Sequence, residues 1–163
     1  KGVRCLKGTR DDFDVFWRLL SHTMDRGGFR THPRSYYEKM LEIPFVDLWR
    51  AEWEGHVVAM GIWSSFAGTV TYLHGASASE YRNLMAPHLL HWTIMRSAKT
   101  RGEVAYDFWG VDVAGTHPSW AGFTRFKTGF GGAVVEYPGT FDLPISRFGY
   151  RLYQLARRIR RFG

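Results

Sequence analysis

The chain has 163 residues, which is the length of one domain with a sizeable core, and its 45% hydrophobic content excludes extensive disorder. A net charge of +7 favours an anionic partner such as nucleic acid, a phosphorylated metabolite or an acidic membrane surface. A single cysteine, Cys5, excludes an internal disulfide framework and a thiolate metal site, and it fits a reducing, cytoplasmic setting. No apolar run approaches the roughly 18 residues that a transmembrane helix requires.

The first half of the chain predicts a strand, two helices and a three-stranded meander. Thr9 is a suitable N-cap for the first helix, and the apolar residues behind it recur at helical spacing. The turns EGH and AGT separate the three strands of the meander. The expected elements are a strand over 1–7, helices over about 10–24 and 35–43, and strands over 46–55, 56–68 and 69–77.

The second half predicts a helix ended by Gly102, a strand, a short helix, a last strand and a basic amphipathic tail helix. These elements are expected over 80–102, 104–112, within 123–132, over 133–139 and over 145–161. The order resembles that of the GNAT acyltransferase fold, an α/β mixed sheet. We therefore expect a single GNAT-like domain over 1–145, followed by the tail helix over 146–163.

The segment after the fourth expected strand bears on coenzyme A. A GNAT enzyme that uses acetyl-CoA has a glycine-rich loop there, whose N–H groups bind the pyrophosphate at a helix N-terminus. Here the loop reads EYRNLMAP, residues 80–87, with Leu84 at the first glycine position. Pro87 also lacks an N–H group. The sequence therefore predicts a poor site for CoA.

Three segments in order resemble the FemABX family of peptidoglycan-bridge aminoacyltransferases, whose members look like tandem GNAT domains. They are YLHGASASEYRNLMAPHLLHW (72–92), YDFWGVD (106–112) and FTRFKTGFGG (123–132). The opening residues 1–29 are similar to the start of the second GNAT-like domain of that family. The resemblance implies transfer of an amino acid from aminoacyl-tRNA to the stem-peptide amine of a peptidoglycan precursor. It implies no cofactor, because aminoacyl-tRNA is the co-substrate.

The resemblance places Lys127 at the catalytic centre, with Phe126 and Phe130 as its walls. Aminolysis of an ester passes through an oxyanion, which a fixed cation stabilises in a site poor in water. The alternative is a lysine whose stem lies over aromatic rings while its ammonium stays in solvent. Asp107, in YDFWG, is a candidate general base by its place in the motif, and its alternative is to hydrogen-bond a neighbouring loop.

The precursor carries a pyrophosphate, so arginines are expected near it. The resemblance implies a precursor-binding arginine and tyrosine in the 26–37 segment, for which Arg34 with Tyr37 is the first choice and Arg26 the second. A solvated basic loop is the alternative. Tyr81 resembles a family tyrosine that contacts the precursor, and Arg82 stands beside it.

Other residues suggest further contacts. Trp109 and Trp120 flank the loop before the lysine and either pack a stem peptide or belong to the core. The seven histidines show no metal-ligand spacing, so no metal is expected. The tail helix is implied to pack on a first domain, with tRNA phosphates or the anionic inner leaflet as alternative partners for its arginines.

The function expected from the sequence is aminoacyl transfer to UDP-MurNAc-pentapeptide or lipid II, in the cytoplasm, with the inner membrane face as an alternative location. The chain begins without Met, so a missing N-terminal GNAT-like domain or a partner chain is also expected. Two alternatives stay open: a GNAT N-acyltransferase that uses acyl-CoA, and a non-catalytic module that binds RNA or a cell-wall precursor.

Overall fold

The structure is a computed structural model that describes residues 2–28 and 30–162. It divides into two compact units, Lys1–Lys127 and Thr128–Gly163. The first unit carries, in order, β1 (Arg4–Lys7), α1 (Phe13–Gly27), α2 (Arg34–Met40), β2 (Val46–Trp53), β3 (His56–Phe66), β4 (Thr69–Ser77), α3 (Ala86–Thr100), β5 (Ala105–Asp107) and α4 (Ala121–Thr128). Short 3-10 turns, η1 (Arg10–Asp12), η2 (Arg82–Leu84) and η3 (Pro118–Trp120), precede α1, α3 and α4.

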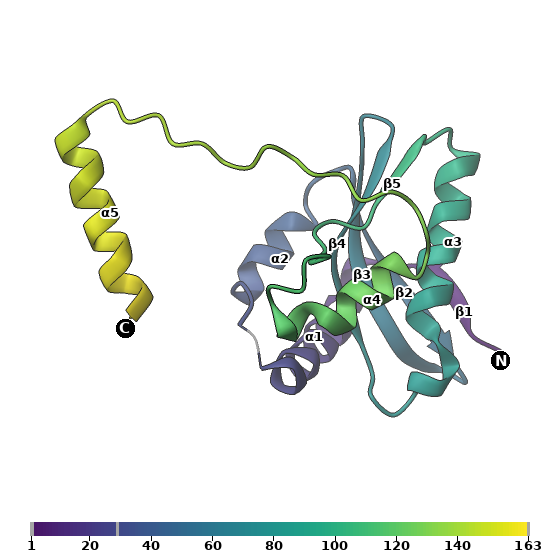
Figure 1. Cartoon of the computed structure of the whole chain (residues 1–163). Helices are drawn as coiled ribbons and strands as arrows, with labels where there is room; N and C mark the ends of the chain where they lie inside the picture. Colours follow the sequence, from purple (N-terminus) through teal and green to yellow (C-terminus); the bar gives the residue numbers. More distant parts are fainter. Residues whose placement is uncertain (1, 29, 163) are drawn as a thin grey trace. The chain divides into compact units, whose positions relative to one another are not determined.

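The five strands form one mixed sheet in the order β1-β2-β3-β4-β5. The first four strands pair antiparallel, and β5 pairs parallel with β4, where Thr69 lies opposite Ala105. Helices α1 and α2 cover one face of the sheet and α3 covers the other (Figure 1). This is the mixed α/β sheet that the sequence predicts.

Each face of the sheet has its own core. On one side Phe16 of α1 and Tyr37 of α2, both fully buried, pack near Ile62 of β3. On the other side α3 buries Leu90 and Ile94 at the helical spacing i, i+4 against the strands. β4 contributes Ala76 to one core and Val70 to the other, which matters because β4 also supplies part of the site described below.

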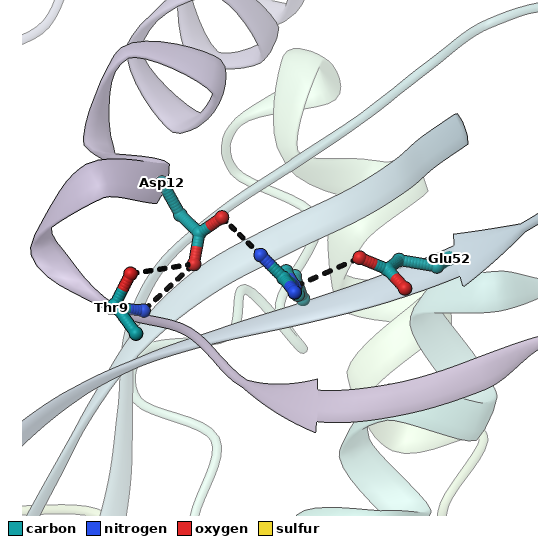
Figure 2. Close-up of polar contacts among 4 residues, drawn as sticks. Thr9, Asp12 and Glu52 are labelled. Atoms are coloured by element: carbon teal, nitrogen blue, oxygen red, sulfur yellow. Dashed lines mark hydrogen bonds and ion pairs between the residues drawn. The ribbon is translucent and has the colours of Figure 1, made fainter. Parts of the chain in front are cut away.

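A polar cluster joins the start of the first helix to the sheet (Figure 2). The Thr9 backbone N–H donates to Asp12 Oδ2 over 2.7 Å, which confirms the helix start expected at Thr9. Asp12 Oδ1 pairs with the Arg50 guanidinium, whose Nε lies 3.0 Å from Glu52 Oε1. Arg50 therefore compensates two poorly exposed carboxylates at once.

Replacing Arg50 by methionine should lower the free energy of unfolding by about 1–3 kcal/mol, because Asp12 and Glu52 lose their shared cation in a largely desolvated place. Chemical denaturation measures this loss. Arg18→Met is the matched control, since Arg18 is an exposed arginine on α1, and it should change stability by about 0.5 kcal/mol or less. Equal stabilities of the two variants would contradict this account of the cluster.

The structure corrects three expected elements. The strand expected over 133–139 is wrong: these residues have no strand conformation, and Gly131 and Gly132 just before them take positive φ angles of 79° and 94°. The strand expected over 104–112 is only β5, because Trp109 adopts a left-handed φ of 65°. The helix expected from residue 80 begins at Ala86, after Met85 takes a φ of 56°.

The second unit contains an extended connection and α5 (Arg147–Phe162), which confirms the helical tail. Tyr150 donates its hydroxyl proton to Asp142 over 2.7 Å. Apolar side chains recur at helical spacing along α5 and are exposed: Phe148, Leu152, Leu155 and Ile159. Across the described residues, every helix is too short or too polar to cross a bilayer.

Candidate active site

Helix α4 brings Lys127 over the edge of β4. The Lys127 Nζ donates to the Gly110 carbonyl oxygen over 2.9 Å. It lies 5.7 Å from the ring centroid of Tyr72 on β4 and 5.2 Å from that of Phe123 on α4. The ammonium is therefore held by one carbonyl and two aromatic faces, at the distances of cation–π contacts.

This environment is partly dry. Burial lowers the pKa of Lys127 below its ordinary value, and the negative charge of Asp107 opposes that effect. A cation with little water around it interacts strongly with any negative charge that develops beside it. The arrangement suits stabilisation of an oxyanion, and it offers no nucleophile of its own.

A buried hydrogen-bonded trio lies behind Tyr72. Trp63 Nε1–H donates to the Tyr106 hydroxyl oxygen over 2.6 Å, and His91 Nδ1 lies 2.7 Å from the same oxygen. Desolvation lowers the pKa of His91 to about 3, so its imidazole is neutral. One hydrogen bond joins the Tyr106 hydroxyl to His91 Nδ1, and the imidazole tautomer decides which of the two donates. Burial raises the pKa of Tyr106, so this hydroxyl keeps its proton.

His91 also organises the rings around the lysine. Its ring meets Tyr72 edge-on at 4.5 Å and Phe126 at 5.3 Å, and it stacks on Phe108 at 5.1 Å. His88, one turn earlier on α3, packs on Phe126 at 4.7 Å. The three motif segments thus meet at one place, and His91 contacts residues from each of them.

Asp107 holds a turn beside this place. Its Oδ1 accepts the backbone N–H of Trp109 over 2.7 Å, which supports the left-handed backbone of that residue. Asp107 therefore makes the hydrogen bond to a neighbouring loop that was the alternative to a role as general base. Its negative charge also raises the pKa of Lys127. Of the expected walls, Phe126 lies next to Lys127 in sequence and packs on His91, whereas Phe130 belongs to the second unit.

The residues expected to bind the precursor do not share one surface. Tyr37 is 0% exposed, and its hydroxyl bonds to Thr31, so in this structure it is a core residue. Arg34 is already paired with Asp14 at 2.6 Å and Glu38 at 2.8 Å, so two carboxylates compete with any phosphate for its guanidinium.

The remaining three expected contacts lie elsewhere. Arg26 donates to Ser79 Oγ over 2.5 Å at the end of β4. Tyr81 packs against the rings of Trp53, at 5.6 Å, and His56, at 6.2 Å. Arg82 is exposed in η2. Within the described residues, no group of three His, Cys, Asp or Glu side chains is placed to hold a metal ion.

The loop at the CoA position closes on itself. The N–H groups of Leu84 and Met85 donate to the carbonyls of Tyr81 and Arg82, and His88 N–H donates to Met85. Pro87 has no N–H at all. These amides are therefore occupied where a pyrophosphate would need them free, in line with the poor CoA site that the sequence predicts.

Sequence reasoning missed the trio of Trp63, His91 and Tyr106. The i, i+3 spacing of His88 and His91 places both on one face of a helix and was considered only as a metal-ligand pattern. It does not show which residues of the sheet pack against that face. Tyr106 belongs to the YDFWG motif, so its motif membership was the available signal.

The buried histidine has a measurable consequence for stability. In the unfolded chain His91 titrates near its ordinary pKa of 6.5, whereas in the folded chain its pKa is about 3. Between these values the unfolded state binds the extra proton, so stability falls as pH drops below about 6.5 and is level above about 7. From pH 7 to pH 5 this one group should cost about 2 kcal/mol.

In His91→Phe, the free energy of unfolding should therefore fall by about 2 kcal/mol less than in the wild type between pH 7 and pH 5, although the variant is less stable at pH 7. Urea unfolding at pH 5, 6, 7 and 8 measures the curve. Because the change acts only through the imidazole proton, wild type and variant should run parallel between pH 7 and pH 8. Parallel curves down to pH 5 would contradict the burial of a neutral His91.

Residues 50–158 match the sequence model of the FemAB family. Aminoacyltransferase FemB of Staphylococcus epidermidis is 33% identical over 104 residues, which cover 63% of this chain and 25% of FemB. Aminoacyltransferase FemA of the same species is 27% identical over 93 residues, covering 56% of this chain and 22% of FemA. The matched region is thus about a quarter of the length of these relatives.

Solved structures show the fold. The crystal structure of FemX superposes with a TM-score of 0.69 at 18% identity, covering 78% of this chain and 49% of FemX. A ribosomal-protein-alanine N-acetyltransferase from Brucella melitensis biovar Abortus 2308 superposes with a TM-score of 0.65 at 14% identity, covering 86% of this chain and 98% of the enzyme. The GNAT-like fold expected from the order of elements is confirmed. With the family match over residues 50–158, the chain belongs to the FemAB family.

Proposed function

We propose that this chain is part of an aminoacyltransferase that moves an amino acid from aminoacyl-tRNA to the stem-peptide amine of a peptidoglycan precursor, in formation of the interpeptide bridge. The observation that carries the proposal is the placement of Lys127, whose ammonium is held by Gly110 and the rings of Tyr72 and Phe123 at the meeting point of the motif segments. Membership of the FemAB family and relatives named aminoacyltransferases support it.

The proposed reaction needs no covalent enzyme intermediate. The acceptor amine attacks the ester carbonyl, the new C–N bond forms, and the negative charge on the carbonyl oxygen is stabilised by the Lys127 ammonium. When the C–O bond breaks, one proton of the amine nitrogen passes to the leaving tRNA oxygen and the other stays on the amide nitrogen. The proton that is released is therefore the one that the acceptor ammonium gives up before it attacks as a free amine. Asp107 is the proposed acceptor of that proton, at the cost of its bond to Trp109 N–H.

The acceptor is proposed to be UDP-MurNAc-pentapeptide or lipid II, in the cytoplasm or at the inner membrane face. Exposed Arg82 and the nearby Tyr81 are the proposed precursor contacts on this chain, with Arg26 at the end of β4 as a further one. Because the matched region is about a quarter of the relatives' length, we propose that a further GNAT-like domain or partner chain completes the acceptor site.

The test is transfer of a radiolabelled amino acid from charged tRNA to each acceptor, with the 163-residue chain alone and together with the further GNAT-like domain proposed above, placed as an upstream domain. Transfer that requires both charged tRNA and acceptor is expected with the upstream domain present. No transfer to either acceptor in any combination would defeat the proposal. Running each of the bridge-forming amino acids separately identifies which one is used.

The second candidate, an acyl-CoA-dependent N-acyltransferase, is favoured only by the fold. Isothermal titration with CoA separates the two. We expect no binding at micromolar concentrations, because the amides of Leu84, Met85 and His88 are bonded within the loop. Micromolar affinity would restore the CoA-dependent reaction.

A further inference from the structure

A row of aromatic side chains leads along the surface to Lys127. His117 stacks on Trp120, with ring centroids 5.1 Å apart and 29° between the planes. Trp120 packs on Phe123 at 5.0 Å, and the Phe123 centroid lies 5.2 Å from Lys127 Nζ. All three rings are exposed, and Trp120 keeps 40% of its surface in solvent. The row is thus open at one end and reaches the candidate active site at the other.

Polar contacts hold this aromatic row in place although part of it lies in a loop. The Asp112 carboxylate accepts the His117 backbone N–H over 2.6 Å and lies 3.4 Å from His117 Nδ1. Thr124 Oγ1 on α4 accepts the Asp112 N–H over 3.1 Å, which ties the loop to the helix. The rings are therefore set before any ligand arrives, so that little ordering entropy is lost on binding.

The cations of helix α4 favour an anionic ligand with flat groups. The carboxylate of Asp112, which also lies against His117, is already bonded to Thr116 Oγ1 and the His117 backbone N–H. Helix α4 contains Arg125 and Lys127 and no acidic residue. Single-stranded nucleic acid has both required features, because its bases stack on aromatic rings and its phosphates pair with lysine and arginine. A neutral sugar or an apolar peptide would use the rings but gain nothing from the two cations.

The proposed function adds a geometric constraint. The donor ester is attached to the ribose of the last nucleotide, so the terminal base lies one sugar away from the reacting carbon. With an ester carbonyl at Lys127, the terminal base is within reach of Phe123, whose ring centroid lies 5.2 Å from Lys127 Nζ, and of Trp120 beside it. We propose that His117, Trp120 and Phe123 form a stacking platform for the unpaired 3′-terminal bases of an RNA; its identity as the aminoacyl-tRNA donor rests on the proposed function.

Fluorescence anisotropy of a labelled single-stranded oligoribonucleotide ending in CCA, titrated with the 163-residue chain, tests the platform. Trp120→Ala should weaken binding by about fivefold or more, the loss of about one stacked base, and Trp120→Phe should retain most of the affinity. Trp92→Ala is the matched control: Trp92 is 55% exposed on α3, and its removal should leave the affinity unchanged.

Two results overturn the platform: no RNA binding by the wild type, or equal RNA affinity of Trp120→Ala and wild type. Loss of affinity for UDP-MurNAc-pentapeptide in Trp120→Ala, with RNA affinity unchanged, would show that the row binds the acceptor instead, and it also overturns the platform. The proposed function fails separately. If RNA binding depends on Trp120 but no aminoacyl transfer occurs, the platform is supported and its assignment to the aminoacyl-tRNA donor is wrong. If transfer occurs but RNA affinity does not depend on Trp120, the proposed function is supported and the platform is wrong.

Discussion

Lys127→Ala should lower the single-turnover rate of aminoacyl transfer by about 10²–10³-fold, the usual effect of removing one group that stabilises an oxyanion. The physical reason is the position of the ammonium, held 2.9 Å from the Gly110 carbonyl and over two aromatic rings, where burial strengthens its field. The measurement is quenched-flow transfer with saturating acceptor and the upstream domain present.

The control for charge alone is Lys99→Ala, which removes an exposed lysine near the end of α3 and should leave the rate unchanged. Lys127→Met keeps the length of the stem without the charge, so it should be as slow as Lys127→Ala. A rate within about threefold of wild type for Lys127→Met would remove the lysine cation from the mechanism.

Gly75→Ala should destabilise the protein by about 1–3 kcal/mol and slow transfer as well. A Cβ at Gly75 would lie 2.0 Å from the Tyr72 hydroxyl oxygen and 2.9 Å from its ring carbon Cζ, so the Tyr72 ring must move. Burial raises the pKa of Tyr72 to about 12, which reflects how tightly this side chain is enclosed. Because Lys127 lies over the same ring, the displacement reaches the site.

Chemical denaturation and the transfer assay together measure both effects. Gly122→Ala is the matched control, since a Cβ there meets nothing within 4 Å and the residue lies in helix α4, where alanine is better than glycine by up to about 1 kcal/mol. Wild-type stability of Gly75→Ala would show that Tyr72 has room to move, and the link from β4 to Lys127 would then be lost.

Much of the fold could be read from local patterns. Helical spacing in α1 and α3, alternation in the meander and the turns between its strands all depend on neighbours within a few residues. The expected strand over 133–139 failed for the opposite reason: a strand is stable only beside a partner, and nothing in its own residues reports whether one is there. The same limit applies to residues beyond Asp107, where Trp109 ends β5.

Some features of the candidate site could likewise be predicted from the sequence and others could not. The lysine motif, its neighbour Phe126 and the unsuitable CoA loop are visible in sequence, because each is a run of adjacent residues. The resemblance implied an arginine and a tyrosine in one segment without fixing which ones, and the structure shows Arg34 paired with carboxylates and Tyr37 buried. Exposure and pairing depend on the opposite surface, which local sequence does not specify.

The sequence by itself determined the family, the order of elements and the presence of a lysine among aromatic residues. Only the tertiary structure decided what surrounds that lysine. Its ammonium lies over the Tyr72 ring, His91 of the Trp63–Tyr106–His91 trio packs on that ring, and the row from His117 to Phe123 ends at the ammonium. The physical reason is that these contacts join β3, β4, α3, β5 and α4, whose relative positions follow from packing of the whole sheet and its two cores.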